Sequence, residues 1–411
     1  MKKICLSILS LLLVSVMLLH ITGCSDLTAG NLTDGLLRGK ADGKTPDESF
    51  KAAQFDFAAE LFKLCAADSG YENTLVSPIS VMTALAMTAN GANGLTEEET
   101  EAVLGGGMST EDLNAYLYAY LENLSDEVSL ANSIWFKENV LDVNEAFLQT
   151  NKDYYDAEIF AAPFDQTTTN DVNAWVKEKT KNRIKKILDE VEADSVMYLI
   201  NALTFDGEWM EKYEKDDVYD RTFTALDGTE KTVSMMYSEE YTYLSDENAE
   251  GFIKKYKGGN YAFAALLPDK DIDFSEFVNS LTGEKLADIL SEKQTRQVSV
   301  GIPEFSYEYD IEMNNALQAM GMESAFDRKT ADFSDIGAAD GNLYIGKVLH
   351  KTFIEVDTFG TKAAAVTLVD VKSESAPAPE LSVILDRPFV YMIIDTETDL
   401  PVFIGTMTNI K

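Results

Sequence analysis

The chain has 411 residues, of which 34 are lysine or arginine and 70 are aspartate or glutamate, so its formal net charge at pH 7 is −36. A hydrophobic fraction of 45% is enough for a large core and excludes a disordered or fibrous protein. The acid excess argues against nucleic acid as a partner, because phosphate binding needs clustered lysines and arginines. Only two histidines are present, which nearly excludes chemistry that depends on several imidazoles.

The first 23 residues have the pattern of an export signal. Two lysines at positions 2 and 3 precede an apolar run over 4–19, which is too short to span a membrane. The run leads to Ile21-Thr22-Gly23-Cys24, which resembles the lipobox of bacterial lipoproteins; the alternative is an ordinary cleaved signal peptide. We therefore expect a lipoprotein signal peptide at 1–23, and lipidation of Cys24 that holds an exported bacterial protein at the cell surface.

Residues 24–49 are rich in aspartate, glycine, threonine and lysine, a composition that predicts a lipidated N-terminus followed by a flexible tether. Residues 50–411 contain no repeat and no proline-rich linker, and we interpret them as one domain. Cys65 falls in an apolar helical stretch, so we expect a buried free thiol and no disulfide.

Helical spacing comes mostly early in this domain and strand patterns come mostly late, which favours an α+β fold with large antiparallel sheets. The predicted helices cover 50–67, 79–90, 170–188 and 311–321. The predicted strands cover 130–137, 196–205, 232–237, 252–256, 260–267, 298–305, 352–357, 363–371, 388–394 and 402–406.

No catalytic constellation emerges from the sequence. Once a signal is removed, His350 is the one remaining histidine, and the G-x-S-x-G, H-E-x-x-H and phosphate-loop patterns are absent. Asp269, Asp271 and Asp273 alternate as in a calcium loop, but Phe274 stands where the sharp-turn glycine belongs. We therefore expect no enzyme activity, no metal and no cofactor.

Residues 361–371 alternate with period 2. The side chains at every second position from Thr361 to Val371 are small or apolar, while Lys362, Asp370 and Lys372 belong to the other face. A polar segment over 373–380, broken twice by proline, follows directly. The pattern predicts a strand with one buried face beside an exposed loop, and by itself it fits an ordinary edge strand equally well.

The order of several short blocks identifies a family resemblance. Asn73 to Ser80, Asn201 to Trp209 and His350 to Val356 appear in the order typical of serpins, and Arg387-Pro388-Phe389 follows near the end. The chain is similar to that family along nearly all of 50–411. One departure is Asn182, where serpins usually have glycine after a helix.

The resemblance implies a serpin fold, which is a single large α+β domain with three β-sheets, surrounding helices and an exposed reactive-centre loop at about 358–381. It also implies a monomeric inhibitor of serine proteases: the protease cleaves the loop, is held as a covalent acyl-enzyme, and the loop inserts into the main sheet. The membrane would be a partner only through the N-terminal lipid. The alternative is a non-inhibitory serpin that acts as a cell-surface binding module.

The hinge, where loop insertion begins, distinguishes these alternatives. Insertion requires small, uncharged side chains on the inward face, and bulky or charged residues there are common in non-inhibitory relatives. Lys362, where inhibitors usually carry glutamate, lies in the outward register. The predicted hinge consists of Gly360, Thr361, Lys362, Ala363, Ala364, Ala365, Val366 and Thr367.

The resemblance also implies roles for residues that control opening of the sheet. His350 matches the buried shutter histidine of serpins, with Asn201 and Ser77 or Ser80 as its expected hydrogen-bond partners. Trp209 matches the tryptophan of the breach, the place where the loop first enters the sheet.

The position of the scissile bond stays open among several alternatives. Family spacing from Gly360 places it after Glu374, whereas counting back from Pro388 gives Pro377. Lys372-Ser373 suits a trypsin-like protease, and Val371, Ser373 and Ala376 suit elastase-like or subtilisin-like ones. We predict elastase-like or subtilisin-like targets first, with the cut inside the window Val371, Lys372, Ser373, Glu374 and Ser375.

Overall fold

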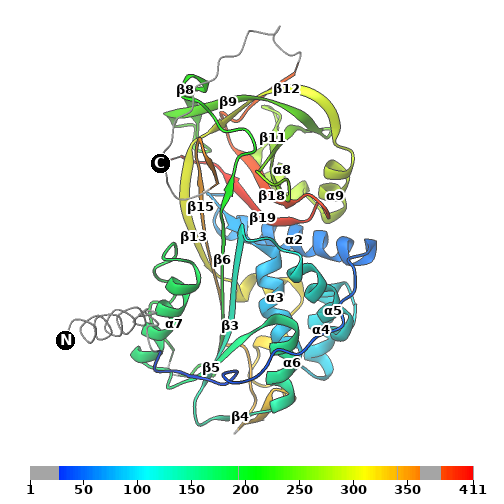
Figure 1. The fold of residues 1–411 in the computed structure, drawn as a ribbon, viewed down its shortest axis with the longest axis vertical. Coiled ribbons are helices and arrows are strands. Elements are labelled where there is room, and N and C mark those ends of the chain that lie inside the picture. The colour runs from blue at the N-terminus through cyan, green and yellow to red at the C-terminus, as the bar shows by residue number, and fades with distance from the viewer. Residues whose placement is uncertain (1–26, 193, 340, 362–380, 411) are drawn as a thin grey trace, which may run out of the picture.

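The computed structural model describes residues 27–192, 194–339, 341–361 and 381–410. The predicted signal peptide, Cys24, the hinge from Lys362 onward, the strand at 363–371 and the scissile window lie outside these residues. The described chain is elongated, with most helices in its lower half and a strand-rich upper half (Figure 1).

A long central sheet runs along the molecule. Within the described residues its strand order is β1-β5-β3-β6-β15-β16-β7, with β13 paired to β15. The helix α3 covers one face of this sheet and α7 the other (Figure 1). The strands are β1 (Gly30–Asn31), β3 (Val128–Lys137), β5 (Glu158–Ala162), β6 (Met197–Phe205), β7 (Gly207–Glu208), β13 (Phe305–Glu312), β15 (Lys347–Val356) and β16 (Gly360–Thr361).

An upper sheet has the order β17-β12-β9-β10-β11-β18-β19-β2, with β8 paired to β9. A short ribbon of β4 (Leu141–Val143) and β14 (Gly337–Ala339) completes the three sheets of the described chain, so the predicted mixed fold with three sheets is confirmed. The upper strands are β2 (Leu75–Val76), β8 (Val218–Thr224), β9 (Glu230–Ser245), β10 (Ala249–Lys255), β11 (Tyr261–Pro268), β12 (Gln294–Pro303), β17 (Leu381–Ile384), β18 (Phe389–Asp395) and β19 (Pro401–Met407).

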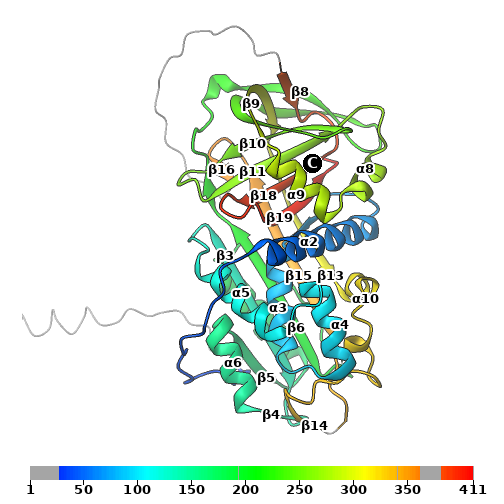
Figure 2. The same cartoon turned by 90° about the vertical axis from the view of Figure 1, so that its right-hand side faces the viewer.

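The helix α3 is the most buried helix and begins at a capped terminus. The side chain of Ser77 accepts from the backbone N–H of Ser80, and Pro78 occupies the first turn, where its missing N–H costs nothing. Figure 2 shows the helices that surround α3. The helices are α2 (Glu48–Asp68), α3 (Pro78–Ala89), α4 (Gly94–Gly105), α5 (Thr110–Glu122), α6 (Glu145–Tyr155), α7 (Gln166–Lys179), α8 (Phe274–Ser280), α9 (Gly283–Ser291) and α10 (Asn314–Met320).

The predicted helix at 170–188 is too long. The helix α7 ends at Lys179, because Lys181 and Asn182 have φ angles of 52° and 66° and turn the chain back. Asparagine tolerates this left-handed conformation better than most residues, which explains how Asn182 replaces glycine here. The apolar residues beyond the turn, Ile184 and Leu188, are buried without being helical.

Two strand predictions also need correction. The prediction at 298–305 merges the end of β12 with the start of β13, which the residue Glu304 separates. The strand predicted at 352–357 begins earlier, at Lys347, because β15 continues along β6 past the polar residues Lys351 and His350.

The prediction of a flexible tether is wrong for residues 27–49. Gly30 and Asn31 pair with the edge of β5, and the carboxylate of Asp171 accepts from the backbone N–H groups of Thr28 (3.0 Å) and Ala29 (2.8 Å). Low hydrophobicity predicted coil, but main-chain pairing with an exposed sheet edge does not require apolar side chains. The segment therefore forms part of the folded domain and leads into α2.

Replacing Asp171 is expected to release this N-terminal segment. Asp171→Ala leaves three donors without their acceptor, two backbone N–H groups and the Thr28 hydroxyl, at a cost of about 1–3 kcal/mol. Limited trypsin digestion should then cut at Arg38 or Lys40 several-fold faster than in the parent chain. The control is Asn170→Ala, a change at an exposed neighbour on α7. Equal digestion rates for the two variants would show that Asp171 does not hold the N-terminal segment in place.

Cys65 is a buried free thiol, as predicted, and burial raises the pKa of this thiol to about 12. The described residues include no helix with the length and apolarity needed to cross a membrane.

Candidate functional site

The candidate site is the seam between β6 and β15 in the central sheet. These two strands run parallel, in a register that extends from Lys347 opposite Tyr198 to Thr352 opposite Leu203. Both strands also have an outer partner that runs antiparallel to them, β3 beside β6 and β13 beside β15. Parallel pairing is slightly weaker than antiparallel pairing, so the seam is a weaker junction than those that β6 and β15 make with β3 and β13.

The first two residues of the predicted hinge already lie above this seam. Thr361 is opposite Val356 of β15 and also opposite Gly207 of β7, and both pairings are antiparallel. The short strand β16 therefore occupies the position of an additional strand, aligned with the seam below it. Thr361 is 2% exposed, so this position is buried before any further part of the loop enters the sheet.

Close backbone approach explains the glycine at position 360. A Cβ atom added to Gly360 would lie 2.0 Å from the carbonyl oxygen of Gly207, so no other residue fits without moving β16 or β7. The preceding turn is held by the carboxylate of Asp357, which accepts from the N–H groups of Phe359 (2.7 Å) and Gly360 (3.1 Å).

Trp209 anchors this turn from the other side. Its indole N–H donates to the carbonyl of Asp357 at 2.8 Å, and its ring is stacked on Tyr256 with centroids 4.6 Å apart. The Tyr256 hydroxyl is 2.6 Å from the Thr361 hydroxyl. The predicted breach tryptophan and the predicted hinge are thus brought together through Tyr256, a residue that the sequence analysis did not identify.

A buried lysine beneath Trp209 was also missed. Lys254 is 2% exposed; its ammonium lies 4.5 Å from the ring centroid of Tyr213 and 5.5 Å from that of Trp209. It forms an ion pair of 2.8 Å with Glu240. The signal was present in the sequence, since Lys254 shares a strand face with Phe252 and Tyr256, both of which are buried.

We expect Lys254→Met to destabilise the protein by about 3 kcal/mol, because it leaves Glu240 partly buried without its cation. Adding Glu240→Gln should restore most of the loss, since an uncharged pair has no such penalty. Urea unfolding midpoints of the parent, single and double variants test this. If Lys254→Met is as stable as the parent, the ion pair between Lys254 and Glu240 does not stabilise this site.

The predicted shutter residues meet halfway down the seam. His350 is fully buried on β15, directly opposite Asn201 on β6. Its Nδ1 is hydrogen-bonded to the side-chain carbonyl of Asn201, and its Nε2 accepts from the backbone N–H of Ser77 at 3.2 Å. The Asn201 amide donates to the Ser80 hydroxyl and to Asn132 on β3. One row of polar groups therefore links β3, β6, β15 and the start of α3.

His350 is neutral in this environment. Burial lowers the pKa of its imidazole from 6.5 to about 3, and the two hydrogen bonds use one nitrogen as donor and the other as acceptor. No described group stands in position to use this histidine as a general base, because each of its nitrogens is already bonded within the core.

The lower end of the seam is held by an ionic contact. The backbone N–H of Glu192 donates to the hydroxyl of Tyr198 on β6, and its carboxylate is 2.7 Å from the ammonium of Lys347 on β15. Lys347 and Tyr198 are register partners, so Glu192 bridges the two strands. Separation of β6 from β15 must break this contact.

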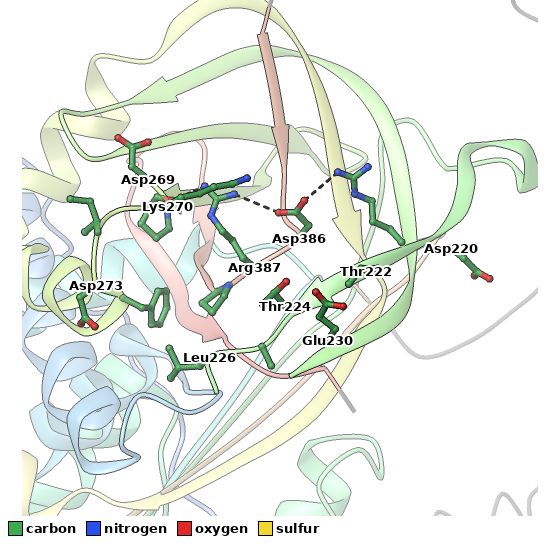
Figure 3. Close-up of a pocket in the computed structure, with 16 residues that line it drawn as sticks. Asp220, Thr222, Thr224, Leu226, Glu230, Asp269, Lys270, Asp273, Asp386 and Arg387 are labelled. Carbon is green, nitrogen blue, oxygen red and sulfur yellow. Dashed lines mark hydrogen bonds and ion pairs between the residues drawn. The ribbon is translucent and has the colours of Figure 1, made fainter. Parts of the chain in front are cut away.

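A cavity of about 880 Å³ lies on the upper sheet (Figure 3). Half of its lining residues are charged, and among them Asp386 pairs with Arg221 at 3.2 Å and with Arg387 at 3.5 Å. Its lining residues include no serine, cysteine or histidine. Among the described residues, no three histidine, cysteine or acidic side chains are grouped so as to hold a metal ion.

Comparison with known proteins shows similarity to serpins along nearly the whole predicted domain. The family model for serpins (serine protease inhibitors) matches residues 52–410. Leukocyte elastase inhibitor A of Mus musculus is 29% identical over 88% of this chain and 100% of its own length. The native state of tengpin, a thermophilic serpin, superposes with a TM-score of 0.89 at 47% identity, covering 93% of this chain and 100% of that one. The latent state of tengpin gives a lower TM-score of 0.80, at 46% identity, with 90% of this chain and 100% of that one covered.

Proposed function

The chain belongs to the serpin family, and from this premise we propose that it inhibits serine proteases as a suicide substrate. A target protease cleaves the loop and is held as an acyl-enzyme while the loop enters the seam between β6 and β15. One observation carries the proposal: Gly360 and Thr361 lie antiparallel between β15 and β7, in line with that seam. Continued insertion would replace one parallel junction by two antiparallel ones.

The remaining contacts support an ordered sequence of opening. The hinge enters at Trp209 and Tyr256, then separates Asn201 from His350, and finally breaks the bridge that Glu192 makes to Lys347. Each of these contacts joins the two sides of the seam or holds the hinge above it. Members of the family that inhibit proteases act on their targets through the loop and have no catalytic site of their own, so we propose no enzyme activity for this chain.

The experiment is incubation with an elastase, a subtilisin and a trypsin, followed by denaturing gel electrophoresis. The proposal expects a band that contains the chain covalently joined to the protease, formed only when the protease serine is active. N-terminal sequencing of the released C-terminal fragment should place the cut between Val371 and Ser375. Cleavage without a covalent complex by all three proteases would favour the alternative, a non-inhibitory binding module.

We also propose that the chain acts as a monomer at the cell surface, attached through lipid on Cys24. The support is the sequence pattern at 21–24, and the test is mass spectrometry of the N-terminal peptide from cell envelopes. A thioether-linked diacylglycerol on Cys24 is the expected result. An unmodified N-terminus that begins elsewhere would overturn the proposed lipid attachment and leave the proposed inhibition untouched.

A further inference from the structure

A cluster of cations lies at the end of α7. Six of the ten residues from 177 to 186 are lysine or arginine and one is acidic, in a chain whose acids outnumber its bases two to one. We call these residues the α7 basic cluster: Lys177, Lys179, Lys181, Arg183, Lys185 and Lys186.

Most of the cluster is available at the surface. Arg183 is used internally, since its guanidinium is 2.5 Å from the carboxylate of Asp206, but the five lysines are exposed. Lys179 and Lys186 form ion pairs with Glu158 and Asp189. Among the residues that the structure describes, Lys177, Lys181 and Lys185 have no ion-pair partner.

Stabilisation of a helix end does not account for all of these charges. Lysines in the last turn of a helix interact favourably with its dipole, which explains Lys177 and Lys179. Lys181 and Lys185 lie beyond the helix. The Asn173 side chain accepts from the backbone N–H groups of Ile187 and Leu188, so the chain that carries Lys181 and Lys185 returns along α7.

The N-terminal end of the described chain lies against the same helix. Thr28 and Ala29 are bound by Asp171 of α7, and Leu27 packs against the apolar cluster that contains Trp175. The described chain therefore begins, at Leu27, beside α7. The strand β16, from which the loop departs, is in the upper half of the molecule, whereas α7 is in the lower half (Figures 1 and 2).

We propose that the α7 basic cluster docks on an anionic phospholipid surface and holds α7 toward the membrane. Each lysine close to the membrane surface is attracted by the anionic headgroups. Acidic residues elsewhere in the domain are repelled by the same headgroups, but salt screens this repulsion beyond about 8 Å at physiological ionic strength. The resulting orientation turns β16, at the start of the predicted hinge, away from the lipid. The orientation rests on the lipidation in the proposed function; the docking itself does not.

The test uses the chain from Cys24 onward with Cys24→Ala, which carries no lipid. It is sedimented at low salt with vesicles of phosphatidylcholine alone, or of equal parts phosphatidylcholine and phosphatidylglycerol. Binding to the anionic vesicles only, and its loss at high salt, is the expected result. Lys177, Lys181 and Lys185→Gln together should weaken binding at least about tenfold, since each lysine contributes a few-fold.

The matched control replaces Lys215, Lys270 and Lys329 by glutamine, the same charge change at three exposed sites outside the cluster. Equal losses in the two triple variants, or no vesicle binding, would overturn the proposal, as would binding to heparin without binding to vesicles. Protease inhibition is measured separately without vesicles. A chain that inhibits but does not bind anionic vesicles overturns only this inference, and one that binds but does not inhibit overturns only the proposed function.

Discussion

Thr361→Arg is expected to turn the proposed inhibitor into a plain substrate. Thr361 is 2% exposed between β15 and β7 and contacts the Tyr256 hydroxyl, so an arginine there would have to bury its charge or leave the sheet. Burying an unpaired charge costs several kcal/mol. Insertion is therefore delayed past the point at which the protease completes hydrolysis of its acyl-enzyme.

The measurement is the number of moles of inhibitor consumed for each mole of protease inactivated. We expect this number to rise by at least about tenfold, since a barrier change of 1.4 kcal/mol already changes a rate tenfold. The control is Thr358→Arg, the same change three residues earlier, at a half-buried position before the hinge. An unchanged stoichiometry for Thr361→Arg would contradict the role assigned to β16.

His350→Gln is expected to remove a large part of the acid sensitivity of the native state. The pKa of His350 is lowered to about 3 in the folded protein, below the ordinary value of 6.5. Above pH 6.5 the imidazole is neutral in both the folded and the unfolded protein, so His350 adds no pH dependence to the stability. As the pH falls from 6.5 towards 3, the unfolded state takes up a proton that the folded state cannot, so stability is lost.

Between pH 7 and pH 4 this single group should account for a loss on the order of 3 kcal/mol. Denaturant midpoints of the parent and of His350→Gln, measured at both values, isolate the contribution because the acidic residues are common to both proteins. Glutamine can still bond to Asn201 and the Ser77 N–H, which limits the cost at pH 7. Identical losses on acidification would show that His350 is not held neutral.

Much of the fold could be predicted from periodicity. The strands β6 and β11 were found to within a residue because they are apolar runs bounded by polar residues. In contrast, β13 was not predicted although Phe305, Tyr307, Tyr309 and Ile311 alternate. The helix predicted at 311–321 wrongly includes the last two residues of this strand, since α10 begins at Asn314. The helices α4, α5 and α6 were not predicted, because apolar and polar residues are mixed along them. Packing against the rest of the domain stabilises such helices.

The site was predicted less completely than the fold. His350, Asn201 and Trp209 could be proposed because family motifs surround them, and the structure places them along one seam. Lys254 and Glu240 could not be paired, because their contact joins separate strands, β10 and β9. The packing of residues 27–49 depends on a free edge of β5, which no pattern within that segment indicates.

If the loop becomes a strand between β6 and β15 after cleavage, the melting temperature of the chain must rise. The purified chain is cut within 371–375 by a protease that does not remain bound, and melting is recorded before and after cleavage. Insertion adds a full central strand, and a rise on the order of 20 °C or more is predicted. A cleaved chain that melts at the same temperature as the intact one would show that the loop does not enter the sheet.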